Sequence, residues 1–301
     1  MDDRFCELCP RRCHADRKKA FGYCKSGVKV KVARAALHMW EEPCISGVRG
    51  SGTVFFSGCT LRCCYCQNYE ISQEGGGIEI SEQRLSELFL QLQDQGANNI
   101  NLVTATQFVP SVIEALESVK HKLKIPVVYN CGGYERLETI ERLKDYVDVW
   151  LPDLKYFDSG LSFKYSNAAD YFKVASEAVS RMVELAGEPV FDFDDSQGAL
   201  MKKGVIIRHM VLPGCYQDSF RILEWIQEHL KAGSYYISLL SQYTPFYKCA
   251  DFPEINRRIT SYEYDKVVAH ALDLGLEQGF MQEKSSAKEE YTPPFDLEGV
   301  L

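Results

Sequence analysis

Six short apolar runs that alternate with helical stretches constrain the fold of this chain more than any other feature. The runs are bounded by Gly, Pro or polar residues, as expected for parallel strands buried on both faces. The predicted strands cover residues 53–56, 100–104, 126–130, 147–151, 204–212 and 235–240. The predicted helices cover residues 81–96, 110–122, 135–146, 170–186, 217–231 and 262–274. The alternation predicts an α/β fold, a partial (β/α)6 barrel of the TIM type, with an open doubly wound sheet as the alternative.

The alternation begins only after residue 50, which divides the chain into three parts. Residues 1–50 are expected to form a cysteine-rich amino-terminal extension, residues 51–282 the partial barrel and residues 283–301 a polar carboxy-terminal tail. The acidic stretch 187–203 is expected to be a surface insertion before the fifth strand. Because the chain has 301 residues, 46% of them apolar, a single large barrel with a sizeable core is feasible.

Charge and cysteine placement narrow the class of protein. Nine of the twelve cysteines lie within the first 66 residues. We expect a cytoplasmic location without membrane contact, because no apolar run approaches ~20 residues and the polar start has no secretory pattern. In such a chain, grouped cysteines favour metal binding over disulfides.

The first 50 residues carry 11 Lys/Arg against 6 Asp/Glu. These basic residues are scattered, which favours a solvated surface over a nucleic-acid footprint.

Three cysteines directly after the first predicted strand form the strongest motif. Cys59, Cys63 and Cys66 have a C-x3-C-x2-C spacing. A [4Fe-4S] cluster is normally held by four thiolates, so three would leave one iron open to a substrate or cofactor. Cys64 is expected to be a buried thiol outside this set, since its spacing crowds two ligands together. The alternative is a structural zinc site completed by Cys64 or by a remote thiol.

A second group of cysteines lies in the extension. Cys6, Cys9, Cys13 and Cys24 supply four thiols, which would close a metal site and make it structural or electron-transferring. A second [4Fe-4S] cluster and a zinc ion both fit the spacing, and free reduced thiols are the remaining alternative. Five cysteines receive no assigned role: Cys44, Cys64, Cys131, Cys215 and Cys249.

The phrase from Phe55 to Ser72, FFSGCTLRCCYCQNYEIS, resembles the corresponding segment of the radical S-adenosylmethionine (SAM) superfamily. The superfamily loop is read here in Cys59, Cys63, Tyr65 and Cys66. Longer phrases look most like the PflX-like group, relatives of pyruvate formate-lyase activating enzyme and other glycyl-radical-enzyme activases. These phrases are CELCPRRC, WEEPCISG, WLPDLKY and IRHMVLPG.

The resemblance implies a reaction. SAM would bind the open iron, and one electron would cleave it to methionine and a 5′-deoxyadenosyl radical that abstracts a hydrogen atom. The implied partners are SAM, a flavodoxin- or ferredoxin-type electron donor and a glycyl-radical protein as substrate, while a peptide or small-molecule substrate stays open. A hypothesis from another class is a non-catalytic iron–sulfur or zinc protein for electron transfer or binding.

The resemblance also suggests cofactor-binding residues at the strand ends. Tyr65 precedes the last thiol and could shield the cluster or pack on adenine. Where the superfamily often has Gly-Gly-Glu after its second strand, this chain has Thr104 and Thr106, which are the expected replacements. After the third strand, Asn130 begins a run whose glycines allow close backbone approach.

Charged residues end the fourth strand and interrupt the fifth. Asp153 and Lys155 match an Asp-x-Lys pair that lies near the SAM carboxylate in the activases. Arg208 resembles an activase arginine that could pair with an anionic carboxylate. Because successive strand residues face opposite sides, at most one of Arg208 and His209 points into the barrel. We expect His209 to be a packing residue.

Overall fold

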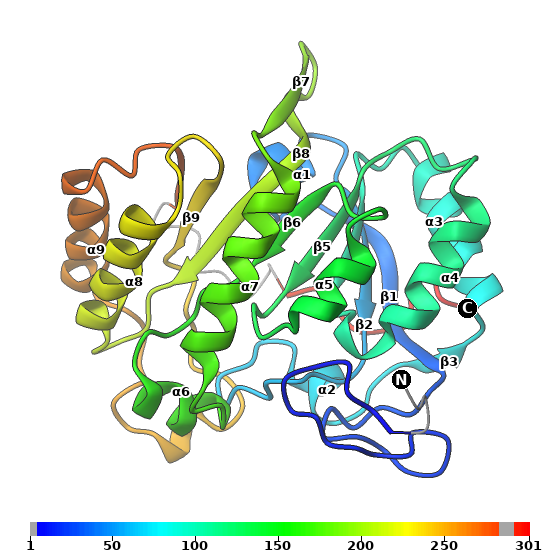
Figure 1. The fold of residues 1–301 in the computed structure, drawn as a ribbon, viewed down its shortest axis with the longest axis horizontal. Helices are drawn as coiled ribbons and strands as arrows, with labels where there is room; N and C mark the ends of the chain where they lie inside the picture. Colours follow the sequence, from blue (N-terminus) through cyan, green and yellow to red (C-terminus); the bar gives the residue numbers. More distant parts are fainter. Residues whose placement is uncertain (1–4, 283–291) are drawn as a thin grey trace.

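A single open α/β sheet organises the protein. The computed structural model describes residues 5–282 and 292–301. The strands are β1 (Val30–His38), β2 (Ser51–Phe56), β3 (Ile78–Ile80), β4 (Ile100–Val103), β5 (Val127–Cys131), β6 (Val149–Pro152), β7 (Val190–Asp194), β8 (Gly198–Met210), β9 (Tyr236–Leu240) and β10 (Gly279–Met281). Within the described residues these ten strands are ordered β10-β9-β8-β6-β5-β4-β2-β1-β3, with β7 paired to β8 (Figure 1).

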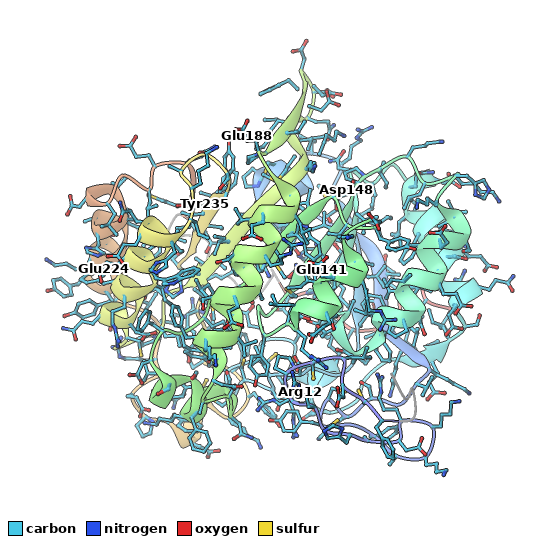
Figure 2. All side chains as sticks on the ribbon, viewed as in Figure 1. Arg12, Glu141, Asp148, Glu188, Glu224 and Tyr235 are labelled. Atoms are coloured by element: carbon cyan, nitrogen blue, oxygen red, sulfur yellow. The ribbon has the colours of Figure 1, made fainter. Side chains whose placement is uncertain are left out.

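Helices connect the parallel strands. They are α1 (Pro43–Ser46), α2 (Tyr69–Ser72), α3 (Glu82–Asp94), α4 (Val109–Val119), α5 (Leu137–Leu143), α6 (Ser159–Ser166), α7 (Tyr171–Ala186), α8 (Tyr216–His229) and α9 (Ser261–Asp273). Single 3-10 turns occur at η1 (Thr106–Phe108) and η2 (Cys249–Asp251). Figure 1 shows α5 and α7 in front of the central strands. Charged side chains such as Glu141 on α5 and Glu224 on α8 lie on this helical layer (Figure 2).

The predicted fold class is confirmed. All six predicted strands are present as β2, β4, β5, β6, β8 and β9, and adjacent members pair in parallel. The sheet is open rather than closed, as a partial barrel requires. Every residue of β2, β4, β5 and β6 is buried, which explains why their sequences are continuously apolar instead of alternating.

The helix boundaries follow ordinary capping chemistry. Ser81 is the N-cap of α3 and accepts a hydrogen bond from the Arg84 N–H at 3.1 Å. At α9, Thr260 and Glu263 form a reciprocal capping box. In the described part of the chain, no helix has both the length and the apolar character that crossing a membrane demands.

The structure adds strands that the sequence pattern did not predict. β1 lies within the predicted extension and pairs antiparallel with β2 and β3. The predicted surface insertion is an antiparallel hairpin of β7 with the start of β8, which protrudes at the top of Figure 1. Residues 283–291 of the predicted tail lie outside the described residues. The rest of the tail runs along β1, where the Ala35 N–H donates to the Glu298 carbonyl at 2.9 Å.

Candidate cluster and cofactor site

The candidate site is a cavity of about 240 Å³ at the carboxyl ends of the parallel strands. Segments that follow β2, β4, β5 and β6 line it, together with residues of β8, as expected for an α/β barrel. The structure brings together ten of the predicted residues in this cavity: Cys59, Cys63, Tyr65, Cys66, Thr104, Thr106, Asn130, Asp153, Lys155 and Arg208. These residues span 150 positions of sequence, so the sheet topology assembles them.

The three thiols of the Cys59 loop share this cavity and each has a hydrogen-bond partner. The Leu61 N–H donates to Cys59 Sγ at 3.4 Å, and Ser166 Oγ donates to Cys63 Sγ at 2.9 Å. Cys66 Sγ lies 3.3 Å from Ser72 Oγ. Burial raises the pKa of Cys66 to about 12, and the neighbouring Cys59 and Cys63 thiols add to the rise. A bound cation would reverse this effect, because metal coordination deprotonates thiols.

Cys64 occupies a different environment from its neighbours. Cys64 is 7% exposed, as is Cys63, but unlike Cys59, Cys63 and Cys66 it does not line the cavity. Burial raises its pKa to about 12, with Cys249 as the next contributor. Its backbone N–H donates to the Tyr165 carbonyl at 2.8 Å, which holds this position of the loop against α6. The geometry agrees with a structural role for Cys64.

A chain of hydroxyl groups runs behind the loop to the Cys63 sulfur. Tyr65 OH lies 2.5 Å from Tyr156 OH, and Tyr156 OH lies 2.7 Å from Ser166 Oγ. Ser166 in turn donates to Cys63. Tyr65 also packs edge-to-face on Tyr243 at 5.7 Å between ring centroids. The ring of Tyr65 therefore forms part of the cavity wall, and the hydrogen bond of its hydroxyl group holds the ring in place.

Arg208 is the centre of a buried charge network. Its Nε donates to Asp153 Oδ1 at 3.0 Å, Nη1 to Glu41 Oε2 at 3.2 Å and Nη2 to Asn130 Oδ1 at 2.5 Å. Lys155 Nζ donates to the other oxygen of Asp153 at 2.5 Å. Asp153 thus bridges the two cations, while Arg208 has an acceptor on each of its three nitrogens.

The network sets the protonation of its members. Burial alone would raise the pKa of Asp153, but Arg208 and Lys155 outweigh burial and hold it below its ordinary value. Burial opposes the charge of Lys155, yet Asp153 raises the pKa of this lysine. Burial raises the pKa of Glu41 despite Arg208. The site therefore contains an ionised Asp153 between two stable cations.

The end of β4 has a strained backbone. Thr104 has φ +59°, a left-handed conformation that is rare for a β-branched residue. Strain of this kind persists where surrounding contacts enforce it, and it is concentrated at functional sites. Here the Thr104 carbonyl accepts from Gln107 Nε2 at 2.8 Å and its N–H donates to the Asn130 carbonyl at 2.9 Å. Thr104 is thus held with its left-handed turn at the cavity wall.

Glu135 is a buried carboxyl group in the same wall. Thr106 Oγ1 donates to Glu135 Oε1 at 2.7 Å, and Tyr129 OH donates to Oε2 at 3.3 Å. Glu135 is 2% exposed, and burial raises its pKa to about 8. It therefore favours the protonated form at neutral pH unless a cation binds beside it.

His209 faces away from the cavity. It is 2% exposed, and its ring nitrogens lie 2.7 Å from the Leu154 carbonyl and 2.8 Å from Ser219 Oγ. Burial lowers its pKa to about 4. His209 is a satisfied packing residue, as expected, and Arg208 is the one that lines the cavity.

Two carboxyl groups of the cavity were missed by sequence reasoning. Glu41 follows β1 and reaches Asn101 Nδ2 at 3.0 Å as well as Arg208. Glu135 follows a glycine turn after β5. Neither residue stands out in the sequence, because Glu41 is followed by a second acidic residue and Glu135 lies in a polar, charged stretch. No spacing rule connects either one to the cysteine loop.

The donor set of the cavity contains three thiols, from Cys59, Cys63 and Cys66. Three thiolates can each bind one iron of a [4Fe-4S] cluster and leave the fourth iron open. A structural zinc ion would need a fourth ligand besides these three. In the portion that the structure describes, no group of three or more His, Cys, Asp or Glu side chains is arranged to hold a metal ion.

The cavity also has groups that match the charged ends of SAM. Lys155 and Arg208 present cations near Asp153, and Glu135 presents a carboxyl group. The volume of about 240 Å³ is below the ~300–1,000 Å³ usual for small-molecule sites. The carboxy-terminal segment contributes Thr292 and Pro293 to the cavity wall.

Comparisons with known proteins agree with this geometry. Residues 53–193 match the family model described as the radical SAM superfamily. The chain is 27% identical over 284 residues to the uncharacterized protein MJ0674 of Methanocaldococcus jannaschii, covering 90% of this chain and 75% of the relative.

Solved structures show the same fold at low sequence identity. The FeFe-hydrogenase maturase HydG from Carboxydothermus hydrogenoformans aligns with a TM-score of 0.53 and 13% identity, covering 80% of this chain and 56% of HydG. Streptococcus suis SuiB bound to its precursor peptide SuiA aligns with a TM-score of 0.51 and 12% identity, over 75% of this chain. This chain spans about half of SuiB, 46% of its length.

Proposed function

Because residues 53–193 make this chain a member of the radical SAM superfamily, which cleaves SAM reductively with a [4Fe-4S] cluster, we propose that Cys59, Cys63 and Cys66 bind that cluster. The observation that carries the proposal is the shared cavity of the three thiols with Asp153, Lys155 and Arg208. When bound and reduced by one electron, the cluster supplies the cleavage of SAM to methionine and a 5′-deoxyadenosyl radical.

Lys155 is the group that we assign to the SAM carboxylate. Arg208 already donates to Asp153, Glu41 and Asn130, whereas the side chain of Lys155 donates to Asp153 at 2.5 Å. An ammonium group has three protons to donate, so Lys155 can hold Asp153 and a substrate carboxylate together. Arg208 positions Asp153 from the other side.

Glu135 is the group that we assign to the SAM ammonium. Its carboxyl group is fixed by Thr106 and Tyr129, so little conformational entropy is lost on binding. A cation beside it would lower its pKa from about 8 and favour the carboxylate. Glu135 thereby performs the role of the acidic residue that the Thr104–Thr106 segment lacks.

The wall of tyrosines protects the reacting radical from solvent. Tyr65, Tyr156 and Tyr243 are each at most 4% exposed, and their hydroxyl groups are satisfied within the protein. A closed wall excludes water and limits side reactions of a radical. The loop thus combines cluster binding with solvent exclusion.

The finer assignment is an activase-like enzyme that abstracts hydrogen from a glycine of a partner protein. Its support is the likeness of four phrases in the sequence to the glycyl-radical-enzyme activases. The second candidate is a peptide substrate, favoured by the fold similarity to SuiB, which was solved with its precursor peptide. In both reactions 5′-deoxyadenosine forms when the radical takes one hydrogen atom from the substrate.

Deuterium transfer distinguishes the two substrates. The reconstituted enzyme, SAM and a one-electron reductant are mixed with an anaerobic lysate from cells grown on α-deuterated glycine. An activase produces deuterated 5′-deoxyadenosine together with the doublet electron paramagnetic resonance signal of a protein glycyl radical. Deuterium transfer without that signal in fractions above peptide size contradicts the activase assignment and supports the peptide substrate.

A further inference from the structure

The amino-terminal cysteine set (Cys6, Cys9, Cys13 and Cys24) gathers at one place although its members span 19 residues. Cys6 and Cys24 lie near enough to Cys9 to interact with its thiol electrostatically. A Cβ atom on Gly22 would lie 3.3 Å from Cys13 Sγ and 3.5 Å from Cys24 Sγ. Cys13 and Cys24 therefore both place their sulfurs beside Gly22.

Backbone hydrogen bonds fix the set. The Cys6 N–H donates to the Ala15 carbonyl and the His14 N–H to the Cys6 carbonyl, both at 3.1 Å. The Gly22 N–H donates to the Ser26 carbonyl at 3.1 Å, which forms a tight turn around Cys24. Between residues 5 and 29 the structure has no helix or strand, so turns of this kind and side-chain hydrogen bonds to the rest of the protein hold the segment.

The number of thiols allows two kinds of metal site. Four thiolates can hold one Zn²⁺, or one [4Fe-4S] cluster with one iron for each thiolate. Zinc has no redox chemistry, whereas a cluster transfers single electrons. The position of the set beside the Cys59 loop therefore decides between them.

The set lies directly against the Cys59 loop. A Cβ atom on Gly58 would collide with the Cys24 carbonyl oxygen at 2.5 Å, so the backbone of Cys24 touches the residue before Cys59. Ser26 Oγ donates to the Ser57 carbonyl at 3.3 Å. Figure 1 shows the segment beside α2, at the edge toward which the β2 arrow points, and Figure 2 marks Arg12 within it.

Arg11 joins the two cysteine-bearing segments. Its Nε donates to the Thr60 carbonyl at 2.9 Å and its Nη2 to the Ser166 carbonyl at 3.0 Å. Nη1 donates to the Asn167 carbonyl. One side chain from between Cys9 and Cys13 thereby holds the loop of Cys59 and the end of α6, which supplies the Ser166 partner of Cys63.

We propose that the amino-terminal cysteine set binds an auxiliary [4Fe-4S] cluster that delivers single electrons to the cluster of the Cys59 loop. Four thiolates leave none of its irons open, so this site transfers electrons and does not bind SAM. Cluster binding stands independently of the function proposed above, whereas the delivery of electrons rests on it.

The electron transfer is balanced and has an entry point. One electron leaves a low-potential donor of the flavin or iron–sulfur class and arrives at the Cys59 loop by way of the auxiliary site. The donor is oxidised by one electron, the cluster of the Cys59 loop is reduced by one, and no atom moves. Cys6 lines a cavity of about 750 Å³ between the segment and residues of η1, α4 and α5, and we assign the approach of the donor to this cavity.

Metal content of the anaerobically reconstituted full-length chain tests cluster binding. We expect about eight irons in the wild type and about four in the Cys59→Ala/Cys63→Ala/Cys66→Ala variant. The Cys6→Ser/Cys13→Ser variant, which changes the two more exposed members of the set, should also hold about four. Cys215→Ser, a partly exposed cysteine outside both sets, is the control and should keep the wild-type content.

Two results would overturn cluster binding. They are about one zinc in the triple alanine variant, or about four irons in the wild type with none in that variant. A chain that holds eight irons but cleaves no SAM would refute the proposed function and leave the auxiliary cluster standing.

Spin coupling tests the path for the electron. The reduced wild type should give an electron paramagnetic resonance spectrum broadened by interaction between two nearby half-spin centres. The broadening should vanish in either cysteine variant. A wild-type spectrum equal to the sum of the two variant spectra would show that the centres are too distant, which contradicts electron delivery.

Discussion

The buried carboxyl group of Glu135 makes the stability of the folded protein depend on pH. Glu135 has an ordinary pKa of 4.5 in the unfolded chain and about 8 in the folded protein, because it is buried. The native state therefore binds more protons than the unfolded state between these values. The contribution of protonated Glu135 to the free energy of unfolding is therefore present at low pH and is lost as the pH rises toward 8.

Glu135→Gln should remove this dependence. We expect the variant to unfold at similar urea concentrations to the wild type near pH 5. Near pH 8.5 it should be more stable by a few kcal/mol, on the order of 1.4 kcal/mol for each unit of pKa shift. Urea unfolding of the cofactor-free protein, followed by tryptophan fluorescence, measures the difference.

Glu138→Gln is the matched control for that experiment. Glu138 lies three residues away, and its own backbone N–H and Arg136 lower its pKa. Glu138 is ionised in the folded and the unfolded protein above pH 5. Its substitution should therefore change the free energy of unfolding by the same amount at each pH above 5. A Glu135→Gln difference that also stays constant would mean that Glu135 is already ionised in the cavity.

Arg208 illustrates the cost of a buried charge that loses its partner. Arg208→Met leaves Glu41 and Asp153 without their guanidinium group, and removing one member of a buried ion pair costs about 3–5 kcal/mol. Urea unfolding should show a loss of this size. Arg181→Met, which breaks only exposed pairs with Glu141 and Glu184, is the control and should change little. Equal effects of the two changes would refute the buried network.

Sequence spacing predicted some of these residues for a physical reason. The thiols of the Cys59 loop lie within eight residues, and Asp153, Lys155 and Arg208 end or interrupt strands whose ends converge in any parallel barrel. Glu41 was not predictable, since it enters the cavity from the turn after β1, an antiparallel strand outside the predicted barrel. Glu135 and Ser166 depend on loop and helix geometry that no periodicity encodes.

At the scale of elements, the parallel strands were predictable because burial on both faces makes them continuously apolar. β1 was missed because Arg34 interrupts its pattern; in the structure this arginine pairs with Asp296 and Glu298 near the carboxyl end of the chain. β3 has only three residues, and β7 is largely exposed, so neither has an apolar pattern to detect.

The hydrogen bonds from Arg11 are expected to order the Cys59 loop. Arg11→Ala removes donors to the Thr60, Ser166 and Asn167 carbonyls, and a charge-assisted hydrogen bond is worth about 1.5–3 kcal/mol. We expect amide hydrogen exchange in the segment 59–66 to become about tenfold faster or more, since 1.4 kcal/mol is a factor of ten. Mass spectrometry of peptides from this segment gives the rate.

Arg12→Ala is the neighbouring control. Arg12 is exposed, and the hydrogen bond found for it is made by its backbone N–H to the Cys9 carbonyl. Exchange in the segment 59–66 should therefore stay at the wild-type rate in this variant. Unchanged exchange in Arg11→Ala would show that the loop is ordered without the extension.

At the scale of the whole molecule, the sheet collects residues from β2 to β8 into one cavity and places a second cysteine group beside it. The extension, the Cys59 loop and the end of α6 are joined by Arg11. In the proposed function, the cavity is the site that binds SAM and the cysteine group beside it supplies electrons.

Formation of 5′-deoxyadenosine by two adjacent cysteine variants tests that claim most directly. Each anaerobically reconstituted protein is given SAM and dithionite, and the product is quantified by liquid chromatography with mass spectrometry. Cys63→Ala should form none, because Cys63 lines the cavity, whereas Cys64→Ala should retain activity, because Cys64 does not line it. Product from Cys63→Ala with none from Cys64→Ala, or no product from the wild type with its cluster intact, would contradict the account.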